Sequence, residues 1–377
     1  MGAPKGIVAM GWRVLLAAAI TLLALARPAH ADILIGAAGP VTGPLASLGE
    51  HMLAGAKQAV ADLNAKGGVL GEKLVLSIGD DQCDPKQAVA VANKLVAEGV
   101  AMVAGHICSD ATIAASKVYQ EESVIMITPT ATSPKLTDEG GASIFRVAGR
   151  DDQQGAVLGK YLAKQFAGRR VAFVHDKTAY GKGLAEATRD AARSGGLESV
   201  LFEAYSAGER DYTALVSRLK EAGIDVLFIG GYHGEAGLIL RQMRDQGLEA
   251  PIIGGDTLVL DEYWAITGEA GEGTLFTFAP DVRKNPKAAL LVKQFRSQGI
   301  EPSGYHLYTY AAIEAWAQAA ERVGSTDSGA VIQALRKAPM ETVIGTFRFN
   351  QNGDVDLPPY AIYHWSDGRF EQLDQES

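Results

Sequence analysis

Short apolar runs alternate with amphipathic stretches along most of the chain. The runs are rich in Val, Ile and Ala, which is typical of strands buried on both faces of a parallel sheet. The stretches between them space their apolar residues as helices do. We therefore expect an α/β fold in which helices cover both faces of parallel sheets. The predicted strands are 33–37, 73–78, 101–104, 124–127, 170–174, 226–229 and 252–253.

The helix predicted after residue 84 has the clearest ends. Asp84 can accept hydrogen bonds from the free amides of the first turn, and Pro85 suits the first helical position. Gly99 follows the last apolar position and ends the helix. We assign this helix a structural role.

The chain divides into two comparable halves, 32–149 and 150–278. A long C-terminal segment follows, and it must return to these halves, which requires several crossings between them. We expect one lobe of residues 32–149 and 279–356, and a second of residues 150–278 and 357–377. The C-terminal segment predicts helices at 287–298, 307–323 and 329–337 and strands at 346–349, 361–365 and 370–373.

The N-terminus has the pattern of a secretory signal. Lys5 and Arg13 precede an apolar run over residues 14–26, and Pro28 leads into Ala29-His30-Ala31, an A-x-A cleavage site. The run is too short to cross the hydrocarbon core of a bilayer. We expect residues 1–31 to be removed and the mature chain to be soluble and exported.

Charge and motifs exclude several function classes. The chain has 44 acidic and 35 basic residues, mixed in sign along its length. No basic stripe could neutralise a run of phosphates, so we expect no nucleic-acid partner. The nearest match to a nucleotide loop, at Gly181-Lys182-Gly183, lacks its third glycine. Without a nucleophile and base, a metal set or a cofactor loop, we expect a protein that is not an enzyme and has no cofactor.

The two cysteines of the chain, Cys83 and Cys108, favour a disulfide in an oxidising compartment. Such a bond would join the turns after two strands that we expect to be neighbours in the first sheet. The alternative is a metal site with His106 beside Cys108. Because only one further thiol is present and no paired metal-binding motif occurs, we expect no metal.

Polar residues follow the predicted strand ends, where open parallel sheets bind ligands. Ser109 begins a predicted helix, whose free amides favour an anion. Residues 128–132 hold three hydroxyls, Tyr232 follows two glycines, and Asp256 follows two more. Taken singly, each could equally be an ordinary turn or a helix cap.

Several strings identify a family resemblance: GAKQAVADLNAKGG (55–68), DDQCDPKQAVAVANK (80–94), GHICS (105–109), ITPTAT (127–132), and VHDK (174–177) with Tyr180-Gly181. Over essentially its whole mature length the chain resembles the periplasmic leucine/isoleucine/valine-binding proteins of ABC importers. The resemblance implies a two-lobed type I periplasmic binding fold, with three hinge crossovers and a ligand enclosed between the lobes.

The resemblance also implies roles for individual residues. Ser109 and Thr132 would hold the ligand carboxylate. The Thr130 carbonyl and the Thr132 hydroxyl would receive the ammonium, with Ala131 between them in the site. Tyr180 and Tyr232 would close on the ligand from the second lobe. The family's cysteine pair corresponds to Cys83 and Cys108.

Two positions depart from the family's branched-chain binders. Asp256 stands where they usually place a Glu for the ammonium, and Leu48 stands where they have an aromatic residue. Leu48 would contact the ligand side chain; alternatively it packs under its own helix and Tyr305 or Tyr308 closes the pocket.

The implied function is that of an extracytoplasmic receptor for a neutral, branched-chain amino acid. The alternatives are small neutral amino acids (alanine, proline, γ-aminobutyrate), or amides, urea or aromatic acids. The implied partners are an inner-membrane ABC permease and its ATPase subunits, and we expect a monomer.

Overall fold

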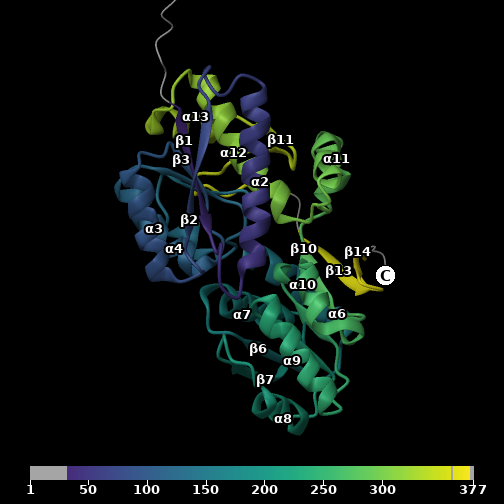
Figure 1. Cartoon of the computed structure of the whole chain (residues 1–377). Helices are drawn as coiled ribbons and strands as arrows, with labels where there is room; N and C mark the ends of the chain where they lie inside the picture. The colour runs from purple at the N-terminus through teal and green to yellow at the C-terminus, as the bar shows by residue number, and fades with distance from the viewer. Residues whose placement is uncertain (1–31, 358–359, 374–377) are drawn as a thin grey trace, which may run out of the picture. The chain divides into compact units, whose positions relative to one another are not determined.

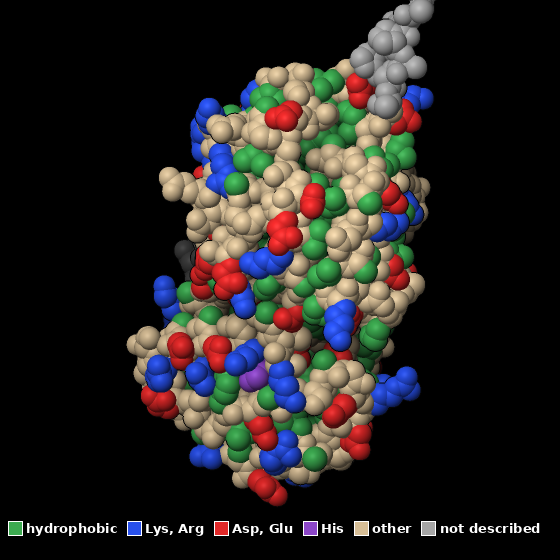
Figure 2. All heavy atoms as spheres, turned by 90° about the vertical axis from the view of Figure 1, so that its left-hand side faces the viewer, with side chains coloured by type: hydrophobic (Ala, Val, Ile, Leu, Met, Phe, Trp, Pro, Cys, Tyr) green, Lys and Arg blue, Asp and Glu red, His purple; other side chains and the backbone are tan. Residues whose placement is uncertain are grey.

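The computed structural model describes residues 32–357 and 360–373, which form two sheets flanked by helices (Figure 1). The predicted signal segment, residues 1–31, lies outside the described residues. Within the described ranges, no helix combines the length and apolar character needed to cross a membrane. On the face drawn in Figure 2, acidic and basic side chains are interspersed rather than gathered by sign.

The first sheet is parallel throughout, in the order β2-β1-β3-β4-β5. Helix α12 lies against α2, and Gly55 permits this approach because a Cβ there would stand 2.3 Å from the His306 carbonyl oxygen. The strands are β1 (Ile33–Gly39), β2 (Leu74–Asp80), β3 (Met102–Gly105), β4 (Ile125–Thr128) and β5 (Ile144–Arg146). The helices with this sheet are α2 (Ala46–Ala65), α3 (Pro85–Ala97), α4 (Ser109–Glu121), α5 (Lys135–Asp138), α12 (Tyr305–Val323) and α13 (Ser328–Lys337).

The second sheet has the order β14-β13-β10-β9-β8-β6-β7 and is not parallel throughout. At its C-terminal end, β13 (Ala361–Ser366) pairs antiparallel with β10. β14 (Arg369–Gln372) pairs antiparallel with β13, as a tight turn between two strands requires. The parallel strands are β6 (Val171–His175), β7 (Ser199–Ala204), β8 (Val226–Gly230), β9 (Ile252–Gly254) and β10 (Leu275–Phe278). The helices are α6 (Asp151–Gln165), α7 (Ala179–Ser194), α8 (Thr213–Glu221), α9 (His233–Asp245) and α10 (Asp261–Thr267).

The remaining elements are short. The strand predicted at 346–349 corresponds to β12, which pairs with β11 in a small hairpin. These elements are α11 (Ala289–Ser297), β11 (Met340–Thr342), β12 (Gly345–Phe347) and the 3-10 turns η1 (Asp256–Val259), η2 (Gly268–Gly271), η3 (Val282–Lys284) and η4 (Pro286–Ala288). The lobe boundaries stay a prediction.

The capping prediction for α3 is confirmed. The Asp84 side chain accepts hydrogen bonds from the Lys86 and Gln87 amides at 2.9 Å each, and Pro85 is the first helical residue. The helix ends at Ala97, and Gly99 follows with a φ of +77°.

The predicted disulfide is present, and its Cα atoms lie 5.4 Å apart. Cys83 follows β2 and Cys108 follows β3, but these strands are not neighbours, because β1 lies between them. The expectation of adjacent strands was wrong because the chain places β2 on one side of β1 and β3 on the other. The disulfide therefore passes across the carboxyl end of β1 and joins the turns that follow the strands on its two sides.

Replacing both cysteines by serine should lower the free energy of unfolding by about 3.5 kcal/mol, since the chain-entropy treatment assigns that value to a loop of this length. The sequence separation is 25 residues. Denaturant titration of the variant and of the oxidised protein measures the difference. Detection of two free thiols in protein that was unfolded without a reducing agent would show that the disulfide does not form.

Candidate functional site

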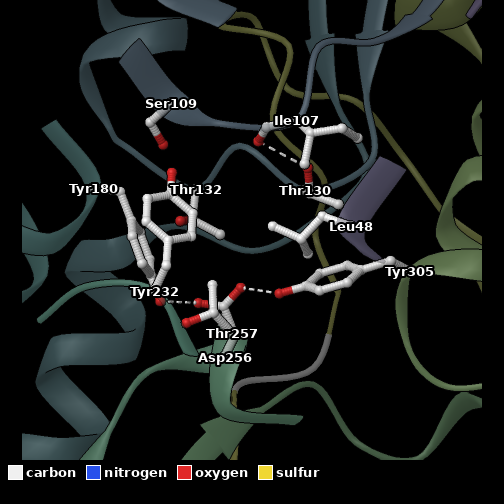
Figure 3. Close-up of a pocket in the computed structure, with 10 residues that line it drawn as sticks. All are labelled: Leu48, Ile107, Ser109, Thr130, Thr132, Tyr180, Tyr232, Asp256, Thr257 and Tyr305. Carbon is white, nitrogen blue, oxygen red and sulfur yellow. Dashed lines mark hydrogen bonds between the residues drawn. The ribbon is translucent and has the colours of Figure 1, made fainter. Parts of the chain in front are cut away.

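A cavity lies where the carboxyl ends of strands from both sheets meet (Figure 3). Its walls come from the start of α2, the turns after β3 and β4, the N-termini of α7 and α12, and the turns after β8 and β9. Parallel strands present their loops at the same edge, which explains why residues distant in sequence converge. The lining residues are Leu48, Ile107, Ser109, Thr130, Thr132, Tyr180, Tyr232, Asp256, Thr257 and Tyr305.

The turns after β3 and β4 form a hydroxyl-rich wall. Ser109 is the first residue of α4, and its Oγ accepts a hydrogen bond from the Ser133 amide at 3.3 Å. The Thr130 hydroxyl donates to the Ile107 carbonyl at 2.9 Å, which ties the two turns together. A hydroxyl beside the free amides of a helix N-terminus is suited to hold a carboxylate.

A buried arginine fixes the shape of this wall from behind. Arg146 is completely buried, and its Nη1 donates to the carbonyls of Ala131 at 3.0 Å and Ser133 at 2.8 Å. Its Nε donates to Asp354 Oδ1 at 3.0 Å. The guanidinium thus sets the path of the turn after β4 and is itself neutralised by a carboxylate 208 residues further on.

Asp256 forms the opposite wall, at the start of η1. Its Oδ1 accepts hydrogen bonds from Tyr180 Oη at 2.8 Å and Gln154 Nε2 at 3.1 Å. Its Oδ2 accepts one from Tyr305 Oη at 2.5 Å, and the two tyrosine bonds are drawn in Figure 3. A carboxylate offers about four acceptor positions. Oδ2 therefore keeps room for a further donor.

The charges at this end of the cavity are unbalanced. Burial raises the pKa of Asp256, against the opposing effect of its hydrogen bonds from Tyr305, Gln154 and Tyr180. Burial and the nearby charge of Asp256 raise the pKa of Asp151 well above its usual value. A hydrogen bond with the Thr132 side chain and the charge of Arg146 oppose this rise only in part. A bound cation would favour the charged form of both carboxyls.

Aromatic and aliphatic side chains complete the cavity. The rings of Tyr180 and Tyr232 lie 5.2 Å apart, and Leu48 and Ile107 add aliphatic surface. Tyr305 packs edge-on against Phe278, with ring centroids 5.5 Å apart. The residue before it is Gly304, where a Cβ would stand 2.2 Å from the Phe278 ring, so only glycine fits there.

The structure brings together nearly all the residues predicted for the site. The exception is Ala131, which does not line the cavity and instead offers its carbonyl to Arg146. The predicted residues that do line it are Leu48, Ser109, Thr130, Thr132, Tyr180, Tyr232 and Asp256. Their contacts with a ligand stay predictions.

Sequence reasoning missed Ile107, Thr257 and Gln154, and it named Tyr305 only as an alternative. Ile107 lies inside the turn 105–109, and Thr257 directly follows Asp256, but neither has a polar signal that distinguishes it from an ordinary turn residue. Gln154 lies behind Asp256, and its Oε1 accepts a hydrogen bond from the Asp256 amide at 3.0 Å. Leu48 and Tyr305 both line the cavity, whereas Tyr308 lines a separate one with Ile344 and Leu357.

The metal alternative for His106 finds no support. Its Nδ1 lies 2.6 Å from Asp81 Oδ2 and its Nε2 lies 2.9 Å from Tyr119 Oη. Cys108 is in the disulfide. Over residues 32–357 and 360–373, no group of three or more His, Cys, Asp or Glu side chains could hold a metal ion.

A histidine pair near the cavity predicts a pH-dependent stability. The rings of His51 and His306 lie 4.1 Å apart, and burial together with His306 lowers the pKa of His51 to about 3. Between that value and the unfolded value near 6.5, only the unfolded chain takes up the proton. We expect stability to fall as the pH decreases through this window, with a contribution from His51 of at most about 1.4 kcal/mol per pH unit.

Thermal unfolding of the wild type and of His51→Gln at pH 5 and pH 7 measures this contribution. The melting temperature of His51→Gln should fall less between pH 7 and pH 5 than that of the wild type. An equal fall in both proteins would exclude His51 as the group responsible.

Comparisons with known proteins agree with this architecture. A family model described as "Periplasmic binding protein" matches residues 32–369. The chain is 47% identical over 358 residues to a "Leu/Ile/Val-binding protein homolog 1" of Brucella melitensis, which covers 94% of this chain and 96% of that protein.

Two solved structures extend the comparison. A leucine-binding protein of Thermotoga maritima superposes with a TM-score of 0.85 and 27% identity, covering 91% of this chain and 98% of that one. A branched-chain amino acid transporter substrate-binding protein of Streptococcus pneumoniae, in complex with isoleucine, gives a TM-score of 0.83 and 27% identity, covering 91% and 99%. The fold predicted from the resemblance is thus confirmed.

Proposed function

Because the chain belongs to the periplasmic binding protein family, we propose that its cavity binds the zwitterion of a neutral amino acid, with branched-chain side chains preferred. The family consists of substrate-binding proteins of transporters, so the protein is not an enzyme, as its sequence predicted. The family resemblance drawn from the sequence strings is confirmed by the same membership.

The observation that carries the proposal is the environment of Asp256. This carboxylate is buried, and its hydrogen-bond donors among the described residues, Tyr180, Tyr305 and Gln154, are all neutral. A buried carboxylate without a counter-charge is costly, and an ammonium group supplies both the charge and a donor for Oδ2. Ser109 and the N-terminus of α4 on the opposite wall are suited to the ligand carboxylate.

The remaining lining residues favour an apolar ligand side chain. Leu48 and Ile107 are aliphatic, and none of the lining residues is Lys or Arg, which an acidic side chain would need. The named relatives are Leu/Ile/Val-binding and leucine-binding proteins. Alanine, proline and γ-aminobutyrate are the alternative ligands, since Asp256 and Ser109 would also serve them. An amide, urea or an aromatic acid would leave Asp256 without a cation.

The same proposal extends to location and partners. Residues 1–31 would direct export to the periplasm and be removed, and the mature monomer would deliver its ligand to an inner-membrane ABC permease with ATPase subunits. We also propose that the polypeptide crosses from one lobe to the other near residues 149, 278 and 356, and that these three crossovers form the hinge. The membership of β13 and β14 in the second sheet, after α12 and α13 beside the first, supports this division.

A competition series tests the ligand class. We expect leucine, isoleucine and valine to bind most tightly, and glycine, glutamate and lysine to bind weakly, in calorimetry with mature protein refolded free of ligand. Differences among the aliphatic ligands should be modest, since one methylene in an apolar pocket contributes about 1–3 kcal/mol. Tightest binding of glutamate or lysine would refute the apolar pocket. A preference for alanine or γ-aminobutyrate would assign the protein to the small neutral ligands.

A further inference from the structure

Asp110 connects the two walls of the cavity without lining it. It is the second residue of α4, directly after Ser109, and its Oδ2 accepts a hydrogen bond from the Ala179 amide at 2.9 Å. Ala179 is the first residue of α7, directly before Tyr180. Ser109 and Tyr180 both line the cavity, one from each sheet's loops (Figure 3). The bond therefore joins the two walls of the cavity, directly beside Ser109 on one wall and Tyr180 on the other.

The Ala179 amide is one of the donors that a helix N-terminus leaves free. The Thr178 hydroxyl caps α7 by accepting from the Gly181 amide at 2.9 Å. Asp110 supplies a second cap, and this one comes from the other half of the chain. A carboxylate is favoured at this position because the positive end of the helix dipole lies there.

A second carboxylate, of the same charge as Asp110, lies close to this contact. Asp176 is buried beside the start of α7, and its Oδ1 receives the amide and the hydroxyl of Thr178 at 2.9 and 2.6 Å. Burial, with contributions from the charges of Glu235 and Asp110, raises the pKa of Asp176 to about 6, although the Thr178 bonds lower it. The repulsion between Asp110 and Asp176 opposes the approach of α4 to α7, and the hydrogen bond from the Ala179 amide to Asp110 favours it.

We propose that Asp110 is a positioning residue: by bonding to Ala179 it holds Ser109 and Tyr180 on the same cavity and thereby strengthens ligand binding. The proposal rests on the amino-acid site proposed above. Because Asp110 is absent from the cavity lining, its contribution would come through Ser109 and Tyr180 and not through a contact with the ligand.

A double-mutant cycle tests this role, with Asp110→Ala and Ala179→Pro. Proline lacks the amide donor and is well tolerated at the first position of a helix. The preceding Thr178 has φ −67° and ψ 161°, a conformation that a following proline favours. Calorimetry with leucine should show binding weakened about 2- to 30-fold in each single variant, the range expected for a lost helix cap. The double variant should bind no more weakly than the weaker single variant.

Two further measurements separate a positioning role from loss of folding. Asp110→Asn keeps an acceptor oxygen, so its affinity should lie between those of the wild type and Asp110→Ala. The ligand-free single variants should still unfold cooperatively, with melting temperatures lowered by no more than the loss of one helix cap explains. Unchanged affinity in Asp110→Ala, or strictly additive losses in the double variant, would overturn the role of Asp110.

The same experiment distinguishes this proposal from the proposed function. If the wild type binds leucine and Asp256→Asn does not, additive losses in the cycle refute the role of Asp110 alone. If the wild type binds none of the amino acids in the competition series, both proposals fall.

Discussion

Replacing Asp256 by asparagine should weaken leucine binding by about 30- to 5,000-fold. The change keeps the size of the side chain but removes its charge, and the ligand ammonium would then be buried without a counter-charge. Truncating one partner of such a pair costs about 2–5 kcal/mol, which corresponds to that range. Titration calorimetry of the wild type and the variant measures it. Equal affinities would remove Asp256 from the site.

Two controls make this result specific. Tyr305→Phe removes one hydrogen bond to Asp256 and leaves the charge, so we expect a loss of only about 2- to 12-fold. The ligand-free form of Asp256→Asn should be at least as stable as the wild type, because burial penalises the charge of Asp256 when no cation is bound. A variant that loses stability together with affinity would instead indicate a structural role.

The parts of the fold that could be predicted are those with local signals. Helix α3 begins and ends at residues that satisfy its free backbone groups, so the sequence alone places it. Strands β5, β7 and β10 were not predicted. β7 lies at the edge of its sheet with only partly buried side chains, which removes the continuous apolar pattern of a central strand. β5 has three residues and β10 has four, and both depend on pairing with neighbours.

The same distinction applies to the cavity. Ser109, Thr132 and Asp256 follow strands, so the rule that ligands bind beyond strand ends indicates their turns, and the family resemblance then selects the residues. Gln154 and Tyr305 reach Asp256 from helices 102 and 49 residues away in sequence. No local pattern indicates such a contact, because it depends on how α6 and α12 pack beside η1. The order β2-β1-β3, which overturned the expected neighbours of the disulfide, depends on long-range packing in the same way.

Replacing Arg146 by methionine should lower the free energy of unfolding by about 3–5 kcal/mol, the cost of breaking a buried ion pair from one side. Arg146 and Asp354 are both buried, and Arg146 also serves the carbonyls of Ala131 and Ser133. The variant would leave these acceptors without their donor. Leucine affinity should also fall, because the turn after β4 would lose the group that sets its path. Denaturant titration and calorimetry measure the two losses.

Arg150→Met is the matched control, since Arg150 also binds Asp354, at 3.0 Å. Its side chain is 16% exposed, and its other partners, Asp138 and Asp152, are about half exposed, so we expect a loss of about 1 kcal/mol or less.

The pH supplies a second test of the Arg146 pair. Burial raises the pKa of Asp354, but Arg146 and Arg150 outweigh it and hold that pKa below its usual value. The stability that this pair contributes is therefore fully present above about pH 4 and is lost as the pH falls below it. Without Arg146 the pKa of Asp354 should rise, and protonation would then relieve a buried charge that Arg150 alone balances. The difference in unfolding free energy between the wild type and Arg146→Met should consequently shrink between pH 7 and pH 4. A difference that does not change with pH would mean that lost packing, and not the buried charge, causes the destabilisation.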